Sequence, residues 1–305
     1  MNTDQNVMSS NKKKVVNLCS FGHPDLSVAG VFDDSILSVA HLVRLCGSVP
    51  VISRNTIDPG ALNILWGAGA HHSPPFASLL QHCNEANTII FNMEQIDSSS
   101  PLVSQEYLKF LTHFRVLDYS VHNIRALRKS YPLIRAEEFP LLPAPEFCHD
   151  HEIIGAERSY HFAFYGSMNQ RRQSVLEHIQ AHGVRIKIIG GMYGKQLSKE
   201  LLECHAVLNI HAYETSVFES ARALRPMAMG MPMVSEISHL PQLIDWGSAP
   251  IKFVEYDALA SCCVHAAQTG FAELRAQAQA EPEFLYRHHR NPALLSSVRY
   301  LLGLD

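Results

Sequence analysis

The sequence predicts an α/β protein with two domains, each built on a parallel sheet covered by helices. Short apolar runs of strand length alternate with segments whose apolar residues recur at helical spacing, an order typical of parallel sheets. The chain has 305 residues, about twice the length of a typical domain. A polar run over 148–158 lies near its middle. We therefore expect a disordered polar tail over 1–14, a first domain over 15–155 and a second domain over 156–305.

The first half begins with a strand–helix–strand unit. Five apolar runs are expected to form strands, at 15–20, 49–52, 63–66, 88–92 and 116–117. A helix should lie between the first two, because apolar residues repeat at helical spacing over 36–45 after a start at Asp34 or Ser35. The proline-rich segment FPLLPAPE, at 139–146, ends this half.

The second half alternates more regularly. Its apolar runs lie at 162–165, 184–189, 207–210, 233–234 and 251–254, and helices are expected at 171–180 and 196–203. Ser216 is followed three residues later by Glu219, a capping-box pattern, so a further helix should start at Val217. The segment 258–302 is expected to form helices that close the back of the molecule.

Composition narrows the function classes. A net charge of −4 gives no support for nucleic acid as the main partner. No window approaches the roughly 18 apolar residues of a membrane span, while peripheral contact with a membrane stays open. The start of the chain is polar and lacks the apolar core of a signal peptide. The seven cysteines include no C-x-x-C pair, as in reduced proteins, so we expect a cytoplasmic protein.

Three polar turns of the second half follow predicted strands and have the composition of a phosphate site. Glycines, hydroxyls, basic side chains and free amides at helix starts all bind anions. The carboxyl ends of parallel strands meet at one edge of a sheet, so the turns should lie together. The alternative interpretation is that each turn is an ordinary connection between a strand and a helix, with no ligand. The candidate donor-binding residues in these turns are Gly166, Ser167, Arg171, Lys195, Ser216 and Val217.

Four short motifs follow strand-like runs or flank the helix expected to start at Val217. They are Phe91-Asn92-Met93-Glu94-Gln95, Asp118-Tyr119-Ser120-x-x-Asn123-Ile124, Leu208-Asn209-Ile210-His211-x-Tyr213-Glu214 and Gly230-x-Pro232-Met233-Val234-Ser235-Glu236. Together they resemble motifs of GT-B glycosyltransferases, specifically a little-characterised bacterial branch. The resemblance implies two Rossmann-like domains facing a cleft, with an acceptor on the first domain and a nucleotide-sugar donor on the second.

The resemblance adds donor-binding candidates in and near the third motif: His211, Tyr213, Glu219 and Arg222. One position departs from the family pattern. Retaining GT-B enzymes usually carry a ribose-binding glutamate five residues before the glycine of the helix-ending turn, and Arg225 occupies that position. The glutamate's role could pass to Glu219, or Arg225 could meet a phosphate. Glu219 and Arg222 also have a simpler interpretation, as a helix cap and as an ion pair at i,i+3 spacing.

Chemistry at an anomeric carbon needs stabilisation of the leaving group and, for inversion, a base for the acceptor hydroxyl. The base should come from the first domain. Glu94, directly after a buried strand, is the first candidate, and His72 and His23 also follow strand-like runs. Hydrogen bonding to loop amides is the alternative role of Glu94. The sequence does not distinguish retention from inversion of configuration at the anomeric carbon.

No metal or other cofactor is expected. The ligand types at 148–151 lie in the linker with a spacing unlike zinc sites, there is no D-x-D triplet, and GT-B enzymes generally need no metal. The resulting hypothesis is a glycosyltransferase that acts on a saccharide or glycoconjugate acceptor in cell-surface polysaccharide synthesis. Two alternatives remain: a GT-B-like sugar-nucleotide epimerase or hydrolase, and a non-catalytic binding module.

Overall fold

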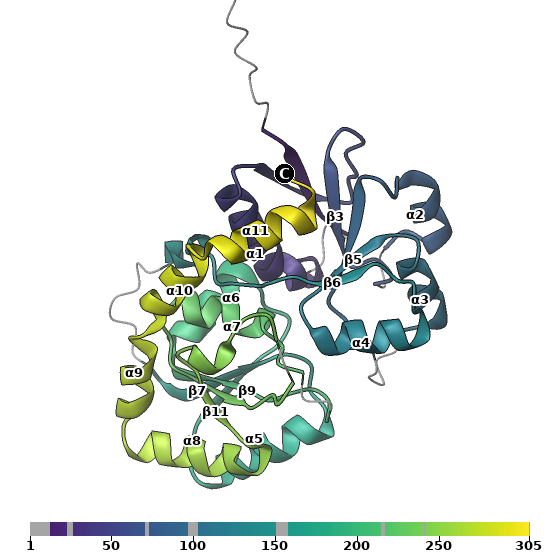
Figure 1. Cartoon of the computed structure of the whole chain (residues 1–305). Helices are drawn as coiled ribbons and strands as arrows, with labels where there is room; N and C mark the ends of the chain where they lie inside the picture. Colours follow the sequence, from purple (N-terminus) through teal and green to yellow (C-terminus); the bar gives the residue numbers. More distant parts are fainter. Residues whose placement is uncertain are drawn as a thin grey trace, which may run out of the picture.

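The computed structural model describes residues 13–22, 27–70, 73–96, 103–150, 158–214, 217–240 and 242–304. Within these ranges the chain forms two parallel sheets, each with helices packed on it (Figure 1). The predicted fold class, two α/β domains with parallel sheets, is therefore confirmed.

The first sheet has the strand order β2-β1-β3-β4-β5-β6, and all its pairs are parallel. Its strands are β1 (Val15–Ser20), β2 (Val49–Arg54), β3 (Leu62–Trp66), β4 (Thr88–Asn92), β5 (Arg115–Asp118) and β6 (Ala136–Glu138). Every residue of β4 is buried, as expected for an apolar run in a sheet covered on both faces. The five expected strands are confirmed to within two residues, and β6 was not anticipated.

The second sheet has the order β11-β10-β9-β7-β8 and is also parallel. Its strands are β7 (Tyr160–Tyr165), β8 (Ile186–Ile189), β9 (Cys204–Asn209), β10 (Met233–Glu236) and β11 (Lys252–Val254). The order reverses at β7, whose neighbours are β8 and β9. Ligands of open α/β sheets bind outside the carboxyl ends of the strands at such a reversal.

Helices connect the strands and complete the layers. Those of the first half are α1 (Asp33–Leu45), α2 (Phe76–His82), α3 (Gln105–Leu111) and α4 (Val121–Ser130), with short 3₁₀ turns η1 (Ser27–Phe32) and η2 (Pro145–Asp150). Those of the second half are α5 (Gln170–Ala181), α6 (Gly194–Leu202), α7 (Ala221–Ala228), α8 (Leu259–Gln268), α9 (Ala272–Ala278), α10 (Glu281–His289) and α11 (Pro292–Leu302), with η3 (Trp246–Ser248) and η4 (Tyr256–Ala258). No helix in the described part of the chain is long and apolar enough to span a bilayer.

Polar residues fix several helix starts. Ser104 accepts a hydrogen bond from a first-turn amide of α3, Ser120 does so for α4, Asn169 for α5 and Asn291 for α11. Such caps satisfy backbone N–H groups that have no partner within the helix, and each contributes about 1 kcal/mol.

The expected start of a helix at Val217 is wrong, because α7 begins at Ala221. Ser216 lies outside the described residues. The side chain of Glu219 is drawn instead into ion pairs with Arg172 and Arg222, at 2.8 and 3.0 Å. A charge-assisted contact with two guanidinium groups outweighs a local cap, which stabilises a helix by only about 1 kcal/mol.

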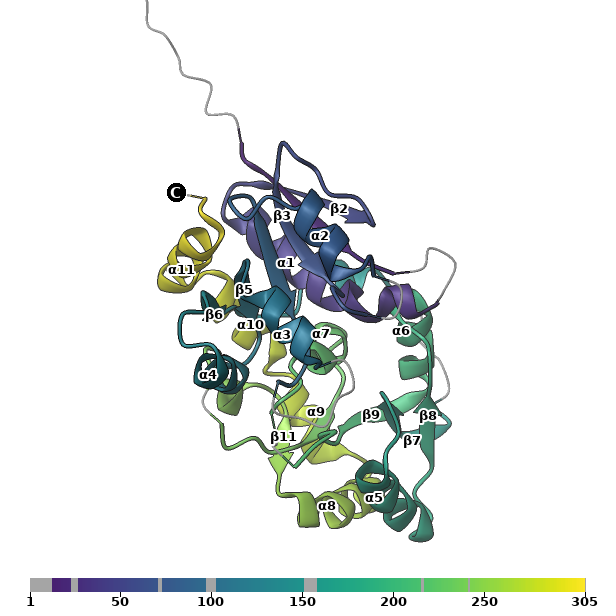
Figure 2. The same ribbon diagram turned by 90° about the vertical axis from the view of Figure 1, so that its right-hand side faces the viewer.

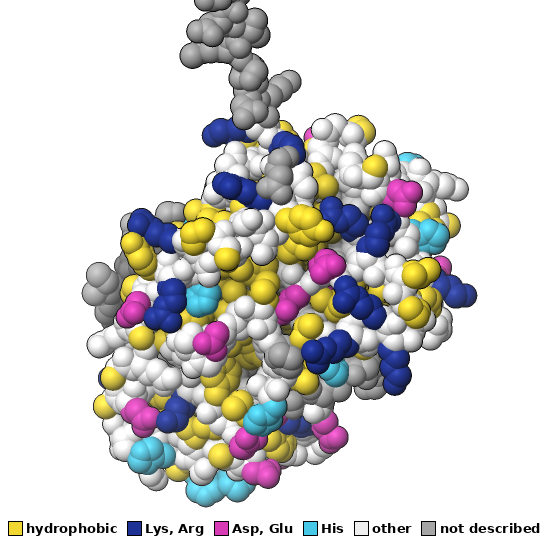
Figure 3. Space-filling view, in the orientation of Figure 1, with side chains coloured by type: hydrophobic (Ala, Val, Ile, Leu, Met, Phe, Trp, Pro, Cys, Tyr) yellow, Lys and Arg dark blue, Asp and Glu magenta, His cyan; other side chains and the backbone are white. Residues whose placement is uncertain are grey.

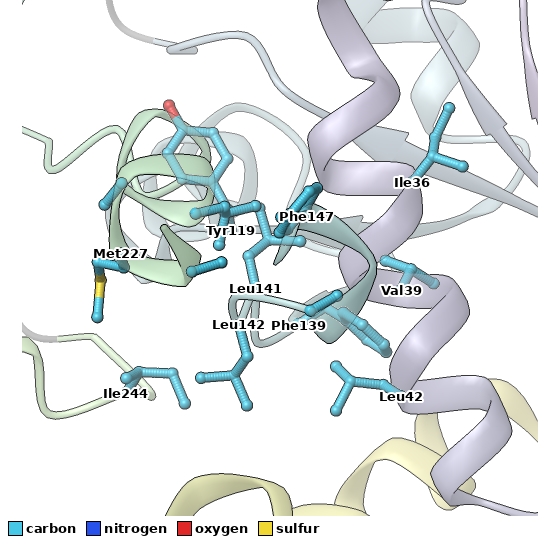
Figure 4. Close-up of a cluster of buried hydrophobic side chains, with 14 of the residues drawn as sticks. Ile36, Val39, Leu42, Tyr119, Phe139, Leu141, Leu142, Phe147, Met227 and Ile244 are labelled. Carbon is cyan, nitrogen blue, oxygen red and sulfur yellow. The ribbon is translucent and has the colours of Figure 1, made fainter. Parts of the chain in front are cut away.

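One hydrophobic core runs between the two domains (Figure 4). In the first half, Ile36, Val39 and Leu42 of α1 contribute to it, and in the second half Met227 and Ile244 do so. The proline-rich segment 139–146 adds several of its buried side chains, including Phe139, Leu141 and Leu142. The domains therefore share apolar packing in addition to the chain that joins them.

The end of the chain returns to the first domain. In Figures 1 and 2, α10 and α11 lead away from the second domain, and α11 ends beside the first. Helix α11 contacts α1. Lys14 donates to the carbonyl of Gly303 at 2.8 Å, and Arg115 donates to the carbonyl of Leu301. The C-terminal helices thus close the back of the molecule, as expected.

Candidate functional site

A cavity of about 380 Å³ lies between the two domains. The second domain supplies the turn after β7, the glycine loop after β8 and the start of α7, and the first domain supplies η1 and the start of α1. The cavity lining includes Gly30, Asp34, Gly166, Ser167, Gly190, Gly191, Tyr193 and Arg222. Two of the three predicted turns therefore meet at one cavity, at the carboxyl ends of β7 and β8.

Two hollows in the second domain are larger. One, of about 680 Å³, is lined by Arg158, Gly230 and Pro232. These residues precede β7 and β10, so this hollow lies at the amino ends of the strands. The other, of about 420 Å³, is lined by Phe218, Trp246 and neighbouring residues of that domain alone. Of these three hollows among the described residues, the cavity at the domain boundary is the one lined by both domains at strand carboxyl ends, so it is the candidate site.

Gly166 lets the backbone approach Arg222 closely. Its φ is +125°, and an added Cβ would overlap the guanidinium group, whose Cζ would be only 2.5 Å away. Arg222 donates through Nη1 to the carbonyl of Tyr165, and the hydroxyl of Tyr165 donates to the carbonyl of Arg222. A glycine at this position therefore holds a cation at the rim of the cavity.

A buried arginine fixes the edge of the sheet beneath that rim. Arg172 is fully buried and donates to the carbonyls of Ile210 and Ser167, at 2.9 and 2.7 Å. Its third partner is Glu219, which also pairs with Arg222. Burial lowers the pKa of Arg172 to about 10, so the guanidinium stays charged at neutral pH.

Arg171 lies in a second ion pair. It binds both carboxylate oxygens of Glu236 and packs over the ring of Tyr256, with Cζ 3.9 Å from the ring centroid. Glu236 also accepts from the amide of His211 at 2.9 Å. Arg171 therefore joins the ends of α5, β9 and β10, and it does not line the cavity.

His211 is fully buried, and neither ring nitrogen forms a hydrogen bond of normal geometry with any described residue. Burial lowers the pKa of its imidazole, while the carboxylates of Glu236 and Glu219 oppose that shift. The ring is therefore neutral at pH 7. The His211 side chain does not line the cavity.

Arg225, which stands where the family resemblance implies a glutamate, joins the two domains. It donates to the carboxylate of Asp34 on α1 through Nη2 at 2.6 Å and through Nε at 3.2 Å. Its Nη1 donates to Ser198 of α6 at 2.8 Å, and Phe147 lies against the guanidinium. Burial raises the pKa of Asp34, and Arg225 opposes that shift.

The remaining donor candidates that the structure describes do not line the cavity. Lys195 follows Gly194, a lining residue, in the first turn of α6. Val217 is buried in the shared core, and Tyr213 is half-buried after β9. Ser216 and the catalytic candidates His72 and His23 lie outside the described residues.

The first two motifs of the first half meet at the carboxyl ends of β4 and β5. Asn92 and Asp118 are neighbours in the sheet, and the Asn92 amide donates to Asp118 at 2.6 Å. Asn123 donates to the other carboxylate oxygen at 3.0 Å, and the backbone amide of Ser120 donates to it at 2.8 Å. Burial raises the pKa of Asp118 to about 7, although these hydrogen bonds oppose the shift.

This network holds the backbone of Glu94. The amides of Asn92 and Asn123 both donate to the carbonyl of Glu94, at 2.8 and 3.0 Å, and the Glu94 amide donates to Asn92 at 3.2 Å. Tyr107 donates its hydroxyl to the same Asn92 oxygen at 2.7 Å. The position of the Glu94 backbone is thus set by buried amide side chains of β4 and α4.

Glu94 lines a small hollow of the first domain together with Phe32, Gly67, Gly69 and Tyr107. Val31, the residue before Phe32, lines the larger cavity, so η1 lies between the two hollows. Within the described ranges, no group of three or more His, Cys, Asp or Glu side chains is arranged to hold a metal ion. The side chains at 148–151 are not described.

Sequence reasoning missed Asp34, Tyr193 and the Asn92–Asp118–Asn123 contacts. Asp34 entered the sequence reasoning only as a helix start, and nothing in local spacing connects it to Arg225, 191 residues away. The contacts around Asp118 were available in principle, because both motifs follow predicted strands that are consecutive in the chain.

No protein-family model matches the chain. Two uncharacterized proteins of Acanthamoeba polyphaga mimivirus are similar in sequence. One is 29% identical over 180 residues, covering 56% of this chain and 23% of that protein, and the other is 27% identical over 176 residues, 57% of each. The chain thus spans less than two thirds of either relative. Because these relatives are viral, the bacterial branch stays a prediction.

Solved structures share the fold over nearly the whole chain. T4 phage β-glucosyltransferase with UDP and Mn²⁺ aligns with a TM-score of 0.58 at 12% identity, covering 94% of this chain and 99% of that one. WaaG, a glycosyltransferase involved in lipopolysaccharide biosynthesis, aligns with 0.56 at 12% identity, covering 94% and 100%. A glycosyltransferase from Rickettsia africae aligns with 0.51 at 11% identity, covering 96% and 100%. The chain therefore has the GT-B fold.

Proposed function

We propose that the protein is a glycosyltransferase that moves a sugar from a nucleotide-activated donor to a saccharide or glycoconjugate acceptor. One observation carries the proposal: the cavity between the domains, where glycine turns after β7 and β8 face η1 and Asp34 beside the Arg222 guanidinium. Its volume of about 380 Å³ falls in the range of small-molecule sites. The solved neighbours that hold UDP and UDP-glucose support a UDP-sugar as the first donor to test.

In this proposal the second domain, 156–305, binds the donor. Arg222 and Lys195 neutralise the diphosphate, and the backbone amides of Ser167 and the glycine loop at 190–191 donate to its oxygens. Arg171, expected at first to contact phosphate, acts through Glu236, because that carboxylate binds its guanidinium in a bidentate pair. The diphosphate is neutralised by these side chains without a resident metal.

The first domain, 15–155, binds the acceptor, and Glu94 is the general base. Its backbone is held by Asn92 and Asn123, which fixes where its side chain leaves the sheet. We propose that the reaction serves polysaccharide or glycoconjugate synthesis in the cytoplasm. WaaG, whose reaction belongs to lipopolysaccharide synthesis, supports that assignment through fold alone.

The test is thermal unfolding with UDP, GDP, ADP and CDP, each with and without Mn²⁺. At a hundredfold excess over Kd, a bound nucleotide stabilises the fold by about 2.7 kcal/mol, which raises Tm by several degrees. We expect one nucleotide to do this without added metal and Arg222→Gln to abolish it. Arg287→Gln, on the exposed surface of α10, is the matched control.

No stabilisation by any nucleotide would contradict the proposal, and stabilisation only with Mn²⁺ would contradict its metal-independent form. Release of nucleotide from the matching sugar-nucleotide without an acceptor would indicate a hydrolase. Binding without any turnover across an acceptor panel would indicate a binding module.

A further inference from the structure

The hollow of about 420 Å³ in the second domain lies beside β11, the edge strand of the second sheet. We call it the aromatic hollow. The segment 237–251, which leads from β10 to β11, supplies most of its lining, and its described lining residues are distinct from those of the cavity between the domains. The lining includes Phe218, Gln242, Trp246, Lys252, Phe253 and Gln277.

Three aromatic rings that pack on one another line the aromatic hollow. The ring of Phe218 lies edge-on to those of Trp246 and Phe253, with centroids 5.2 and 5.4 Å apart. Trp246 also contacts Phe284 of α10, with a centroid distance of 5.9 Å. Aromatic pairs favour such tilted contacts, and each ring here is held by at least one of them. The hollow therefore offers a fixed apolar surface to a ligand.

Several polar groups of the lining have no partner within the described ranges. The indole N–H of Trp246 donates to no described residue, although Trp246 is only 7% exposed. Gln242 is half-buried, and its amide forms no hydrogen bond with a described residue. Gln277 donates through Nε2 to the carbonyl of Ile251 at 2.9 Å, which leaves its Oε1 able to accept. Largely buried groups of this kind usually have partners, so a ligand that supplies them fits here.

The chemistry of the lining favours an uncharged ligand with hydroxyl groups. Lys252 is the one charged side chain among the described lining residues, and Glu273 binds its ammonium group at 2.7 Å. A phosphate would therefore meet a cation that is already paired. An aliphatic ligand would leave the indole N–H and the amides without partners. A sugar ring suits both features, because its C–H face packs on aromatic rings while its hydroxyls donate to and accept from amides.

We propose that the aromatic hollow is a saccharide subsite, which binds a neutral sugar unit of the acceptor at a distance from the cavity. That this sugar belongs to the acceptor rests on the proposed function, whereas the binding of a sugar does not. Strands β11 and β7 are three strand spacings apart in the sheet, about 14 Å. An acceptor that is held in the hollow while its end lies in the cavity is therefore an oligosaccharide and not a single sugar.

The segment that lines the aromatic hollow also contacts the first domain. Leu243 donates its amide to the carboxylate of Glu138, at the end of β6, at 2.7 Å. Figure 3 shows hydrophobic side chains in the middle of this face, between the places where Figure 1 labels α10 and β6. Glu138, Asp118 and Asn92 are successive partners across the first sheet. The segment thus meets the first domain at the strand ends that hold Glu94, so a sugar chain leaving the hollow has a path toward the proposed base.

The test uses intrinsic tryptophan fluorescence, because the chain has two tryptophans and Trp246 is the one that lines the aromatic hollow. Trp66 is fully buried in the first domain and stacks on Phe91, so Trp66→Phe leaves Trp246 as the single reporter. The probes are neutral trisaccharides of glucose, galactose, mannose or N-acetylglucosamine. We expect at least one of them to change the emission of Trp246 saturably. Calorimetric titration of the wild type gives the Kd independently of the Trp66→Phe variant.

Two variants test the contacts of the sugar. Trp246→Phe keeps an aromatic ring and removes the N–H, and Gln242→Leu keeps a side chain of similar size and removes the amide. By calorimetry, each should weaken binding of the same trisaccharide about fivefold, as expected for one lost hydrogen bond between neutral groups. The matched control is Gln180→Leu on the exposed surface of α5, which should bind the trisaccharide as the wild type does.

The absence of saturable binding for every trisaccharide would overturn the proposal, as would equal affinity of the wild type, Trp246→Phe and Gln242→Leu. Loss of trisaccharide binding in Arg222→Gln would also overturn it, because the sugar would then occupy the cavity. A change in emission with octanol but with no trisaccharide would identify an apolar hollow and overturn it as well. Nucleotide-induced stabilisation of each variant, measured in parallel, reports separately on the donor site.

Discussion

Replacing Arg225 with methionine tests the ion pair that joins the two domains. Arg225 is buried, its guanidinium binds both carboxylate oxygens of Asp34, and Ser198 accepts from its remaining nitrogen. Methionine keeps much of the volume and removes the charge. Asp34 is then left largely buried, without its cation, at a boundary where its negative charge is poorly hydrated.

Removing one partner of a buried ion pair costs about 3–5 kcal/mol. Since about a fifth of the Asp34 side chain stays exposed, the lower value is appropriate here. At about 2–4 °C per kcal/mol for chains of this size, Arg225→Met should lower Tm by about 6–12 °C. The double variant Arg225→Met with Asp34→Asn removes both charges and should recover most of that loss.

Tm measured by circular dichroism for the wild type, both single variants and the double variant completes the cycle. Arg287→Met is the control, because Arg287 pairs with Glu283 on the exposed surface of α10, where an ion pair contributes less than about 1 kcal/mol. The reasoning fails if Arg225→Met lowers Tm by less than about 2 °C. It also fails if the loss in the double variant equals the sum of the two single losses.

Three further outcomes follow from the site. The pKa of Asp118 is raised from 3.8 to about 7, so folding binds a proton between these pH values. The contribution of Asp118 to the free energy of unfolding therefore falls by up to about 4 kcal/mol between pH 4 and 7. Asp118→Asn should flatten that part of the Tm–pH curve, and an unchanged slope would argue against this role of Asp118. Gly166→Ala should displace Arg222 and weaken nucleotide binding at least tenfold. Gly183→Ala is the control, because Gly183 also has a positive φ but no other atom lies within 4 Å of the added Cβ, so nucleotide binding should not change. Equal effects of the two substitutions would point to backbone strain alone. Glu94→Gln should lower turnover about 100-fold or more at normal donor affinity, and wild-type turnover would exclude Glu94 as the base.

Local patterns predicted most of the fold. Strands β1, β3 and β4 were readable because most of their residues are buried and apolar, so a short hydrophobic run between turns marks each one. Strand β6 was missed because it has three residues, two of them glutamates, at the edge of the sheet. Its position depends on pairing with β5, which no local pattern encodes.

The candidate site was predictable only in part. The turns at Gly166 and at 190–191 follow strands, so their place at the cavity could be anticipated. The partners of the arginines could not: Glu219 pairs with Arg172, 47 residues earlier, and Arg225 with Asp34, 191 residues earlier. Pairing at such separation is decided by the packing of the sheets and helices, and it overrode the capping-box pattern at Glu219.

The path of the chain at its C-terminal end limits how the domains can move. The chain passes from the first domain to the second after η2, and it returns between α10 and α11, whose last turn is held by Lys14 and Arg115. Two bodies tied at two separate points, with a shared core and the Asp34–Arg225 ion pair between them, resist twisting and sliding. We therefore expect any opening over the cavity to be a small rotation about the line through both ties, because a larger one would expose the shared apolar side chains to water.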